Sequence, residues 1–335
     1  MKKTFLSFLI LTYRRPTKLR RLLEVFLNEE FSNSKKAEME IIIVDDHGED
    51  DTHDIISPVM GLLSDSGWSV KYIYRSQNLR GDRNLYEGYT KDCKGDYVWF
   101  LCDDDLIKPE IAIEFIAEIK SKQPVLALCG FQQGLDNQIK NNLGENIRCI
   151  SNFNEVVYWM TKFPKTSAYV YRTCNLNLNP LIERWDRTLH SWVGIGIYIQ
   201  QKIGGQLLLY PEITAEADSE YLNLQYSYRI FGKLAGVVQD CCRLLGLSFD
   251  EVQKNNSALS DCDELTLCLQ GLSAHYSYRS LARYNGNVLA EEKIYLRKNI
   301  KFLLRTRQRS VATAKLVIFY LICVVQTISK RRKKL

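Results

Sequence analysis

The 335-residue sequence lacks several patterns that would place it in a specialised class of protein. Its ten cysteines form no C-x-x-C pair, and its four histidines have no zinc-ligand spacing with them. We therefore expect no disulfide framework and no zinc site, and interpret the cysteines as thiols of a reducing compartment. No repeat of solenoid length is present. The first fifteen residues alternate like a strand, so no secretory signal is predicted.

The composition is that of an ordinary globular protein, with 46% hydrophobic and 25% charged residues. Acidic residues are missing from one segment, because none follows Glu292 whereas 13 Lys and Arg do. The first 292 residues therefore hold 32 basic and 39 acidic groups, a net charge of −7. A body with this charge is not predicted to bind nucleic acid. The basic tail is a separate feature.

Four segments in the first third of the chain are predicted to be strands: Phe5–Thr12, Met39–Val44, Val70–Tyr74 and Tyr97–Cys102. The first two are mostly apolar runs typical of buried strands. Helical patterns follow Pro16 and are also predicted over Asp82–Lys91, with Asp82 as the N-cap, and over Ile107–Lys120. This alternation predicts an α/β fold, with an open and mostly parallel sheet covered by helices on both faces. Later segments are less regular: two strands (Ala168–Tyr171, Gln206–Tyr210), one helix (Trp192–Lys202) and a mainly helical region from Tyr221.

Three polar clusters follow the predicted strands, at the edge where open α/β sheets bind ligands: Thr12-Tyr13-Arg14, Asp45-Asp46 and Asp103-Asp104-Asp105. Adjacent carboxylates repel one another unless a cation lies among them, and Mg²⁺ or Mn²⁺ is usually held by one or two carboxylates plus substrate phosphates. Carboxylates after the second strand can accept hydrogen bonds from a base or ribose. The alternative for the Asp103-Asp104-Asp105 cluster is a solvated acidic turn before Pro109. The alternative for Asp45-Asp46 is N-capping of the helix that follows.

Arg80, Arg83 and Asn84 follow the third strand. Arginine offers a fixed fork of donors that suits phosphate oxygens. The alternative for these two arginines is an ordinary solvated surface.

In this order and spacing, the motifs resemble those of the family 2 glycosyltransferases over roughly residues 4–125: T-Y-R-R-P (12–16), I-I-I-V-D-D (41–46), N-L-R-G-D-R-N (78–84) and G-D-Y-V-W-F-L-C-D-D-D-L-I-K-P (95–109). The nearest branch is that of the abequosyltransferase-like enzymes of bacterial O-antigen assembly. That likeness rests on D-R-N (82–84), A-Y-V-Y (168–171) and E-R-W (183–185).

The resemblance implies a GT-A fold and inverting transfer from a nucleoside diphosphate sugar. By the same resemblance, Thr12 and Asp46 contact the base and ribose, and Arg83 contacts the diphosphate. The predicted nucleotide-sugar site is completed by further residues of the same motifs: Tyr13, Arg14, Asp45, Arg80, Asn84 and Asp103. The predicted ligands of Mn²⁺ or Mg²⁺ are Asp104 and Asp105. Many family members carry another carboxylate where this chain has Cys102.

Inverting transfer needs a general base near the acceptor hydroxyl. Where the family places it, the chain offers Glu183, Asp186 and His190, and we predict Asp186 first and His190 second. Trp185 and Trp192 are predicted either to stack on sugar rings or to belong to the core.

We predict a GT-A catalytic domain over 1–215, divided into a nucleotide-sugar half (1–125) and an acceptor half (126–215). A helical accessory region (216–310) and a basic, hydrophobic tail (311–335) follow. The apolar run Leu316–Val325 is too short to span a bilayer, and its basic flanks favour an anionic membrane surface. The alternative for the tail is an amphipathic helix packed on the catalytic domain.

The sequence thus predicts a cytoplasmic enzyme, peripheral on the inner face of the cell membrane, that uses a polyprenyl-linked oligosaccharide acceptor in O-antigen or capsule synthesis. The lipid-linked acceptor is implied by the family and not by the tail. A nucleotidyltransferase is one alternative, although the Gly-rich loop expected after the first strand is missing. A catalytically inactive relative that binds nucleotide-sugar is another, because of Cys102.

Overall fold

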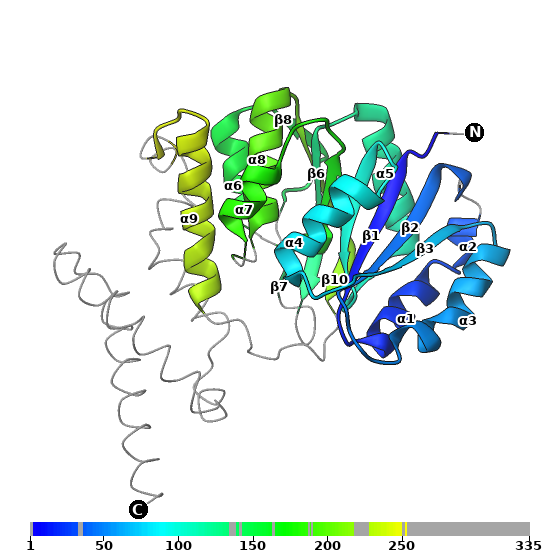
Figure 1. Ribbon diagram of the computed structural model, residues 1–335. Coiled ribbons are helices and arrows are strands. Elements are labelled where there is room, and N and C mark those ends of the chain that lie inside the picture. Colours follow the sequence, from blue (N-terminus) through cyan, green and yellow to red (C-terminus); the bar gives the residue numbers. More distant parts are fainter. Residues whose placement is uncertain are drawn as a thin grey trace, which may run out of the picture.

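A computed structural model of the chain describes residues 3–32, 36–133, 139–140, 143–162, 165–186, 188, 190–217, 228–249 and 252. One curled sheet lies at its centre, in the order β3-β2-β1-β4-β9-β6-β10-β5, with β7 paired to β6 and β8 to β10 (Figure 1). The described strands are β1 (Leu6–Thr12), β2 (Met39–Asp45), β3 (Ser69–Tyr74), β4 (Tyr97–Cys102), β5 (Asp105–Ile107), β6 (Leu126–Gln133), β7 (Ile139–Lys140), β8 (Arg148–Ile150), β9 (Tyr169–Arg172) and β10 (Leu207–Ala217).

The sheet is mostly parallel, which confirms the predicted fold class. β3, β2, β1 and β4 are parallel neighbours, and β6 is parallel to β10. β9 lies antiparallel between β4 and β6, so that β6 again runs in the direction of β4. The carboxyl ends of these six parallel strands therefore lie along one edge of the sheet, here called the carboxyl edge.

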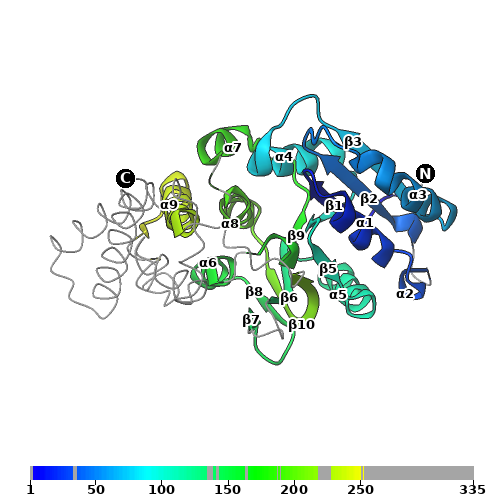
Figure 2. The same ribbon diagram turned by 90° about the horizontal axis from the view of Figure 1, so that it is seen from below.

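Helices cover both faces of the sheet (Figure 2). α1, α3 and α5 lie on one face, and α4 lies on the other, where it also contacts α7 and α8. The helices are α1 (Pro16–Val25), α2 (Glu29–Ser32), α3 (Thr52–Asp65), α4 (Arg80–Glu87), α5 (Pro109–Lys122), α6 (Phe153–Lys162), α7 (Asn179–Trp185), α8 (Ser191–Ile203) and α9 (Tyr228–Leu244), with a π-helical turn over Gly88–Asp92.

Alternation along the strands builds a separate core on each face. On the face of α1 and α5, Phe8 packs against Trp99 of β4, with ring centroids 5.6 Å apart. Its ring also lies 4.9 Å from Phe26, at the end of α1, and 6.1 Å from Trp68. Trp99 in turn contacts Phe115 of α5 edge-on at 5.3 Å. All five rings are buried, so this aromatic cluster fixes the helices onto the parallel strands.

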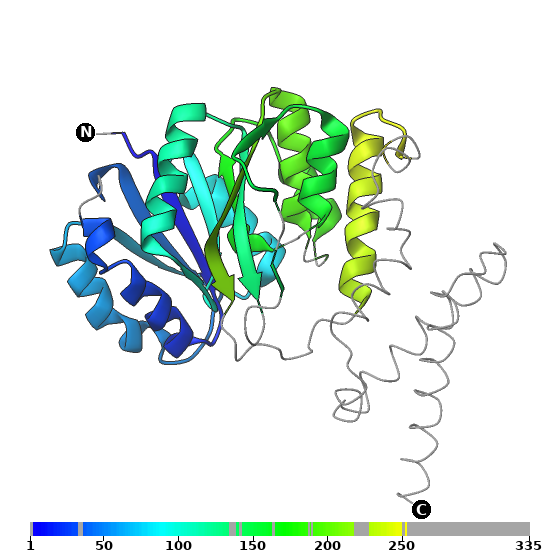
Figure 3. The same cartoon turned by 180° about the vertical axis from the view of Figure 1, so that it is seen from behind.

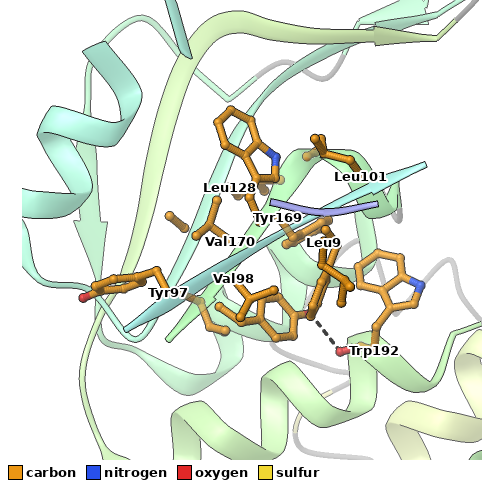
Figure 4. Close-up of a cluster of buried hydrophobic side chains, with 14 of the residues drawn as sticks. Leu9, Tyr97, Val98, Leu101, Leu128, Tyr169, Val170 and Trp192 are labelled. Carbon is orange, nitrogen blue, oxygen red and sulfur yellow. Dashed lines mark hydrogen bonds between the residues drawn. The ribbon is translucent and has the colours of Figure 1, made fainter. Parts of the chain in front are cut away.

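The next residue along each strand points to the opposite core. Leu9 faces α4 and the π-helical turn, where a Cβ added at Gly88 would lie 2.7 Å from the leucine Cδ1, so only glycine allows this approach. Phe100 packs edge-on against Tyr171, whose hydroxyl donates a hydrogen bond to the Trp192 carbonyl oxygen at 2.8 Å (the dashed line in Figure 4). Trp192 is 4% exposed and belongs to this core, as one of its two predicted roles required.

Trp185 is likewise part of the core. It is 2% exposed, and its indole N–H donates to Asp240 of α9 at 3.0 Å. Asp240 also forms an ion pair with Arg184, so α9 is tied to the end of α7 as well as packed on α8. Figure 3 shows that, within the described part of the chain, α9 lies at the end opposite to α1 and α3.

The structure differs from the sequence-based expectation around Asp82. The helix begins two residues earlier, at Arg80, and Asp82 is not its N-cap. The Asp82 side chain is buried and accepts hydrogen bonds from the backbone N–H and the hydroxyl of Ser191, at 3.2 and 2.6 Å. A buried carboxylate is stable when it is hydrogen-bonded, and here it joins the first turn of α4 to the start of α8.

Most of the predicted accessory region and the whole tail lie outside the described residues. Of the segment 216–310, only residues 216–217, α9, the few residues after it and Val252 are described. Within the described part of the chain, none of the helices combines the length and apolar character needed to cross a bilayer.

A buried polar network closes the opposite, amino edge of the sheet. The Ser7 hydroxyl donates to Glu40 at 2.6 Å and accepts from the Gly95 backbone N–H at 2.9 Å. The same Glu40 oxygen accepts from the Lys94 backbone N–H at 2.7 Å. Two side chains inside β1 and β2 therefore fix the segment that leads into β4.

We predict that Ser7→Ala lowers the free energy of unfolding by about 1–3 kcal/mol, because it leaves the buried Gly95 N–H and Glu40 without their partner. Urea denaturation followed by circular dichroism measures the effect. Ser64→Ala is the matched control: this exposed serine of α3 bonds only its own helix backbone at Met60, and its loss should change stability by less than about 0.5 kcal/mol. Equal effects of the two substitutions would contradict the role of the network.

Candidate active site

The three polar clusters predicted from the sequence meet at the carboxyl edge. Thr12 is opposite Asp45 in the register of β1 and β2, and Leu11 is opposite Cys102 in that of β1 and β4. The Thr12 hydroxyl donates to Asp103 at 2.7 Å, and its carbonyl oxygen accepts from the Asp46 N–H at 3.0 Å. Thr12 therefore links the other two clusters, as expected for ligand-binding residues at this edge.

Arg15 pairs with the acidic cluster after β4. Its Nη1 lies 3.0 Å from an Asp103 oxygen and 3.1 Å from an Asp104 oxygen. The Asp103 side chain is 4% exposed, that of Asp104 16% and that of Arg15 33%. Burial raises the pKa of Asp103 to about 6, although the Arg15 guanidinium opposes this shift.

The Asp105 side chain is fixed by Ser167. The Ser167 hydroxyl donates to Asp105 at 2.5 Å and accepts from the Cys102 backbone N–H at 2.9 Å. Burial, followed by the charge of Asp104, raises the pKa of Asp105 to about 7. Burial also raises the pKa of the Cys102 thiol, and the three following carboxylates add to that effect.

The donor set fits a divalent cation. One ligand atom each of Cys102, Asp104 and Asp105 lie within 4.8 Å of one another. Oxygen donors of carboxylates suit Mg²⁺ and Mn²⁺, whereas a thiol is a soft ligand. Asp104 and Asp105 are therefore the residues that would hold the ion. Substrate oxygens would complete its coordination.

A second group of side chains lies beside Asp45. One Asp45 oxygen accepts from the Gly48 backbone N–H at 2.9 Å, and the other accepts from the Tyr72 hydroxyl at 2.6 Å. The His47 ring lies 5.2 Å from that of Tyr74, which is 49% exposed. This arrangement of a fixed carboxylate and exposed rings suits a flat heteroaromatic base.

Tyr13 and Arg14 border the same group. Tyr13 is 41% exposed, and the Arg14 guanidinium lies 5.1 Å from its ring centroid. The Arg14 Nε donates to the Gly48 carbonyl oxygen at 2.6 Å, and Nη2 lies 3.4 Å from Glu49. Both side chains are accessible at the carboxyl edge, as the predicted nucleotide contacts require.

Asp46 is bound by the backbone that follows β3. Its two oxygens accept from the Leu79 and Arg80 N–H groups at 2.6 and 2.8 Å, so it caps α4. The alternative expected for Asp46 was N-capping of the helix that directly follows it. The structure instead places its hydrogen bonds at the start of α4. Burial raises the Asp46 pKa, and these two backbone N–H groups oppose the shift.

Arg80 and Arg83 occupy the first turn of α4, where Arg80 is exposed and Arg83 half-buried. Asn84 is buried, and its Oδ1 accepts from Arg75 Nε at 3.0 Å. Arg75 also pairs with Asp92 at 2.6 Å, so it connects the end of β3 to α4 and the π-helical turn. The two arginines therefore lie beside the site, whereas Asn84 supports its framework.

Backbone strain is concentrated at this edge. Among the described residues, five non-glycine residues have positive φ, and four belong to the loops of the carboxyl edge: Arg14 (56°), His47 (62°), Glu49 (51°) and Arg80 (68°). Such conformations are disfavoured for L-residues and gather at functional sites.

The predicted general bases lie at two helix ends. Asp186 follows α7, and the buried His190 precedes α8. Ser191, next to His190, is bound by Asp82 of α4, so the start of α8 is fixed to the helix that begins at the carboxyl edge.

Sequence reasoning missed four residues that shape the site: Arg15, Tyr72, Arg75 and Ser167. Arg15 was part of the T-Y-R-R-P motif, so a signal for it existed. Arg75 directly follows a predicted strand, and this position was a weaker signal. Ser167 belongs to a short 3₁₀ turn more than 60 residues from its partner, and no local pattern identifies it.

Comparison with solved structures supports the same fold. The S. aureus TarS fragment 1–349 in complex with UDP has a TM-score of 0.56 at 14% identity, covering 88% of this chain and 78% of that one. The same fragment with UDP-GlcNAc has a TM-score of 0.54 at 13% identity, covering 87% and 81%. At this identity the likeness concerns the fold alone.

A mannosyltransferase from Pyrobaculum calidifontis, PcManGT, in complex with GDP-Man and Mn²⁺, has a TM-score of 0.51 at 10% identity, covering 97% of this chain and 86% of that one. No curated protein sequence matches the chain.

The family comparison is decisive. The profile described as Glycosyl transferase family 2 matches residues 7–185, which is more than half of the chain and includes all three polar clusters of the carboxyl edge. Together with the mostly parallel, curled sheet, this match identifies the fold as GT-A-like. The chain belongs to the family 2 glycosyltransferases.

Proposed function

We propose that this protein transfers a sugar, with inversion, from a nucleoside diphosphate sugar to a hydroxyl of a lipid-linked oligosaccharide. The observation that carries the proposal is the acidic cluster of Asp103, Asp104 and Asp105, which lies at the carboxyl edge beside the group around Asp45. A base and a diphosphate bound across this edge would span the two groups. The solved relatives contain UDP, UDP-GlcNAc or GDP-Man.

In this proposal, the donor's base lies against Tyr13 and Tyr74, next to Asp45. Thr12 and Asp46 are close to the ribose, and the exposed Arg80 and half-buried Arg83 contact the diphosphate. Arginine forks bind phosphate oxygens well, and the positive end of α4 adds favourable electrostatics.

Asp104 and Asp105 would hold the divalent ion, which when bound would supply positive charge to neutralise the leaving diphosphate. Ser167 orients the Asp105 carboxylate for this role, and the buried position of the cluster at the ends of β1 and β4 excludes water from one side.

The acceptor hydroxyl must lose a proton to a general base as the bond to the sugar forms. We propose Asp186 or His190 for this role, because both lie where the family places it and the start of α8 is tied to α4. The half 126–215 would then bind the acceptor.

We also propose that the acceptor is polyprenyl-linked, as in O-antigen or capsule synthesis, and that the protein works at the cytoplasmic face of the membrane. The resemblance of the D-R-N, A-Y-V-Y and E-R-W segments supports the acceptor, and the 13 Lys and Arg after Glu292 support the membrane location.

The first test is binding of UDP-, GDP-, dTDP- and CDP-sugars, each with and without Mn²⁺, measured by calorimetry together with donor hydrolysis. We expect one nucleotide to bind at least about tenfold more tightly than the others, a difference of about 1.4 kcal/mol, and Mn²⁺ to strengthen that binding. A failure to bind any of them in the presence of Mn²⁺ would show that the acidic cluster is structural.

We predict that Asp104→Asn lowers the rate of transfer on the order of 100-fold or more, because the ion loses a ligand and several kcal/mol of charge stabilisation. Initial rates with saturating donor measure the effect, and circular dichroism checks the fold. Asp54→Asn is the matched control, since that carboxylate is 89% exposed on α3. Unchanged turnover of the Asp104 variant would refute the metal assignment.

The general base is identified by comparing Asp186→Asn with His190→Gln. Removing the true base should reduce kcat by about 10²–10⁴-fold and leave donor affinity unchanged. The exposed Glu155→Gln of α6 serves as a control of equal chemistry. If both variants keep at least half of the wild-type kcat, neither residue is the base.

A further inference from the structure

Arg15 occupies the place of a cation within the acidic cluster. A single nitrogen, Nη1, contacts one oxygen of Asp103 and one of Asp104, at 3.0 and 3.1 Å. The second Asp103 oxygen accepts from the Thr12 hydroxyl at 2.7 Å, so the Asp103 carboxylate is held on both sides. Asp104, in contrast, is also one of the residues that fit a divalent ion.

Arg15 and a divalent ion cannot both sit close to Asp104 at low cost. Two like charges a few ångströms apart repel strongly near a protein surface, and a divalent ion doubles the charge on one side. The Asp104 carboxylate that pairs with Nη1 is also one of the groups that fit the ion. The guanidinium therefore competes with the ion for Asp104.

The backbone of Arg15 is fixed while its side chain is not enclosed. The residue is the N-cap of α1, and its carbonyl oxygen accepts from the Leu19 N–H at 3.1 Å. The preceding Arg14 has φ of 56°, which sets the direction of the turn. With the side chain 33% exposed, the guanidinium can leave Asp104 by rotating its side-chain torsions, while the sheet and helix stay in place.

We infer that Arg15 is the internal counter-cation of the acidic cluster and that it restrains metal binding until donor is present. In the metal-free protein it pairs with both Asp103 and Asp104. When Asp104 takes the ion, Arg15 keeps its contact with Asp103 and turns toward anionic oxygens of the donor diphosphate. This last step rests on the proposed function, whereas the competition for Asp104 does not.

The test is a titration of the full-length, nucleotide-free protein with Mn²⁺, in which electron paramagnetic resonance measures the free ion. We expect Arg15→Gln to bind Mn²⁺ at least about fivefold more tightly than the wild type, the lower end of ordinary coupling between sites. Arg20→Gln is the matched control. It removes the same charge from an exposed arginine of α1, whose partner is Glu24, and should change the affinity by less than about twofold.

Tighter Mn²⁺ binding by Arg15→Gln distinguishes competition for Asp104 from structural damage, because a variant with a disturbed site would bind the ion more weakly. Arg15→Lys keeps the charge but loses the planar fork, and it should fall between the wild type and Arg15→Gln. It also provides the measurement if Arg15→Gln does not fold. An unchanged or weaker affinity of both Arg15 variants would overturn the inference, as would an equal gain for Arg20→Gln or the lack of Mn²⁺ binding by every variant.

A second titration in the presence of the preferred nucleoside diphosphate tests the later step. The diphosphate should raise the Mn²⁺ affinity of the wild type by a larger factor than that of Arg15→Gln, because only the wild type gains from releasing Arg15. Equal factors would overturn the step that moves Arg15 to the diphosphate. Failure of all nucleotides to bind would instead refute the proposed function, while the nucleotide-free titration would still decide the competition.

Discussion

The parallel register of β2, β1 and β4 is the constraint on which the rest of the site depends. It brings the ends of three strands, separated by up to 91 residues of sequence, within hydrogen-bonding distance, as the bond between Thr12 and Asp103 shows. The aromatic cluster around Phe8 and Trp99 fixes this register from one face, because a slip of one residue would exchange the two cores. Packing along the whole strand thus fixes the relative positions of the site residues at one edge of the sheet.

The second feature of the site is the way in which its charges are compensated. Each of four carboxylates at the carboxyl edge has protein partners: Asp45 has Gly48 and Tyr72, Asp46 caps α4, Asp103 has Thr12 and Arg15, and Asp105 has Ser167. Asp104 differs, because its partner among the described residues is the partly exposed Arg15. A group held this loosely is the one that can exchange its partner for a ligand.

Much of the fold could be predicted from the sequence, since its principal strands are short segments and the apolar runs of β1, β2 and β4 each end in a polar cluster. The order of the strands beyond β4 could not, because β9 is inserted antiparallel between β4 and β6 by pairings that no local pattern specifies. For the site, the motifs predicted which residues gather at the carboxyl edge. They did not predict that the Asn84 side chain would accept a hydrogen bond from Arg75. Nor did they predict that the Asp82 side chain would bind Ser191 instead of capping its own helix.

The sequence by itself determined the class of the protein, because apolar periodicity and the polar residues at strand ends are properties of short segments. Only the tertiary structure decided which carboxylates are committed to the framework and which remain more exposed, as Asp104 does. That distinction depends on partners distant along the chain, such as Arg15 for Asp103 and Ser167 for Asp105. Hydrogen bonds and burial set the charge and freedom of such groups, and both arise only when the segments pack together.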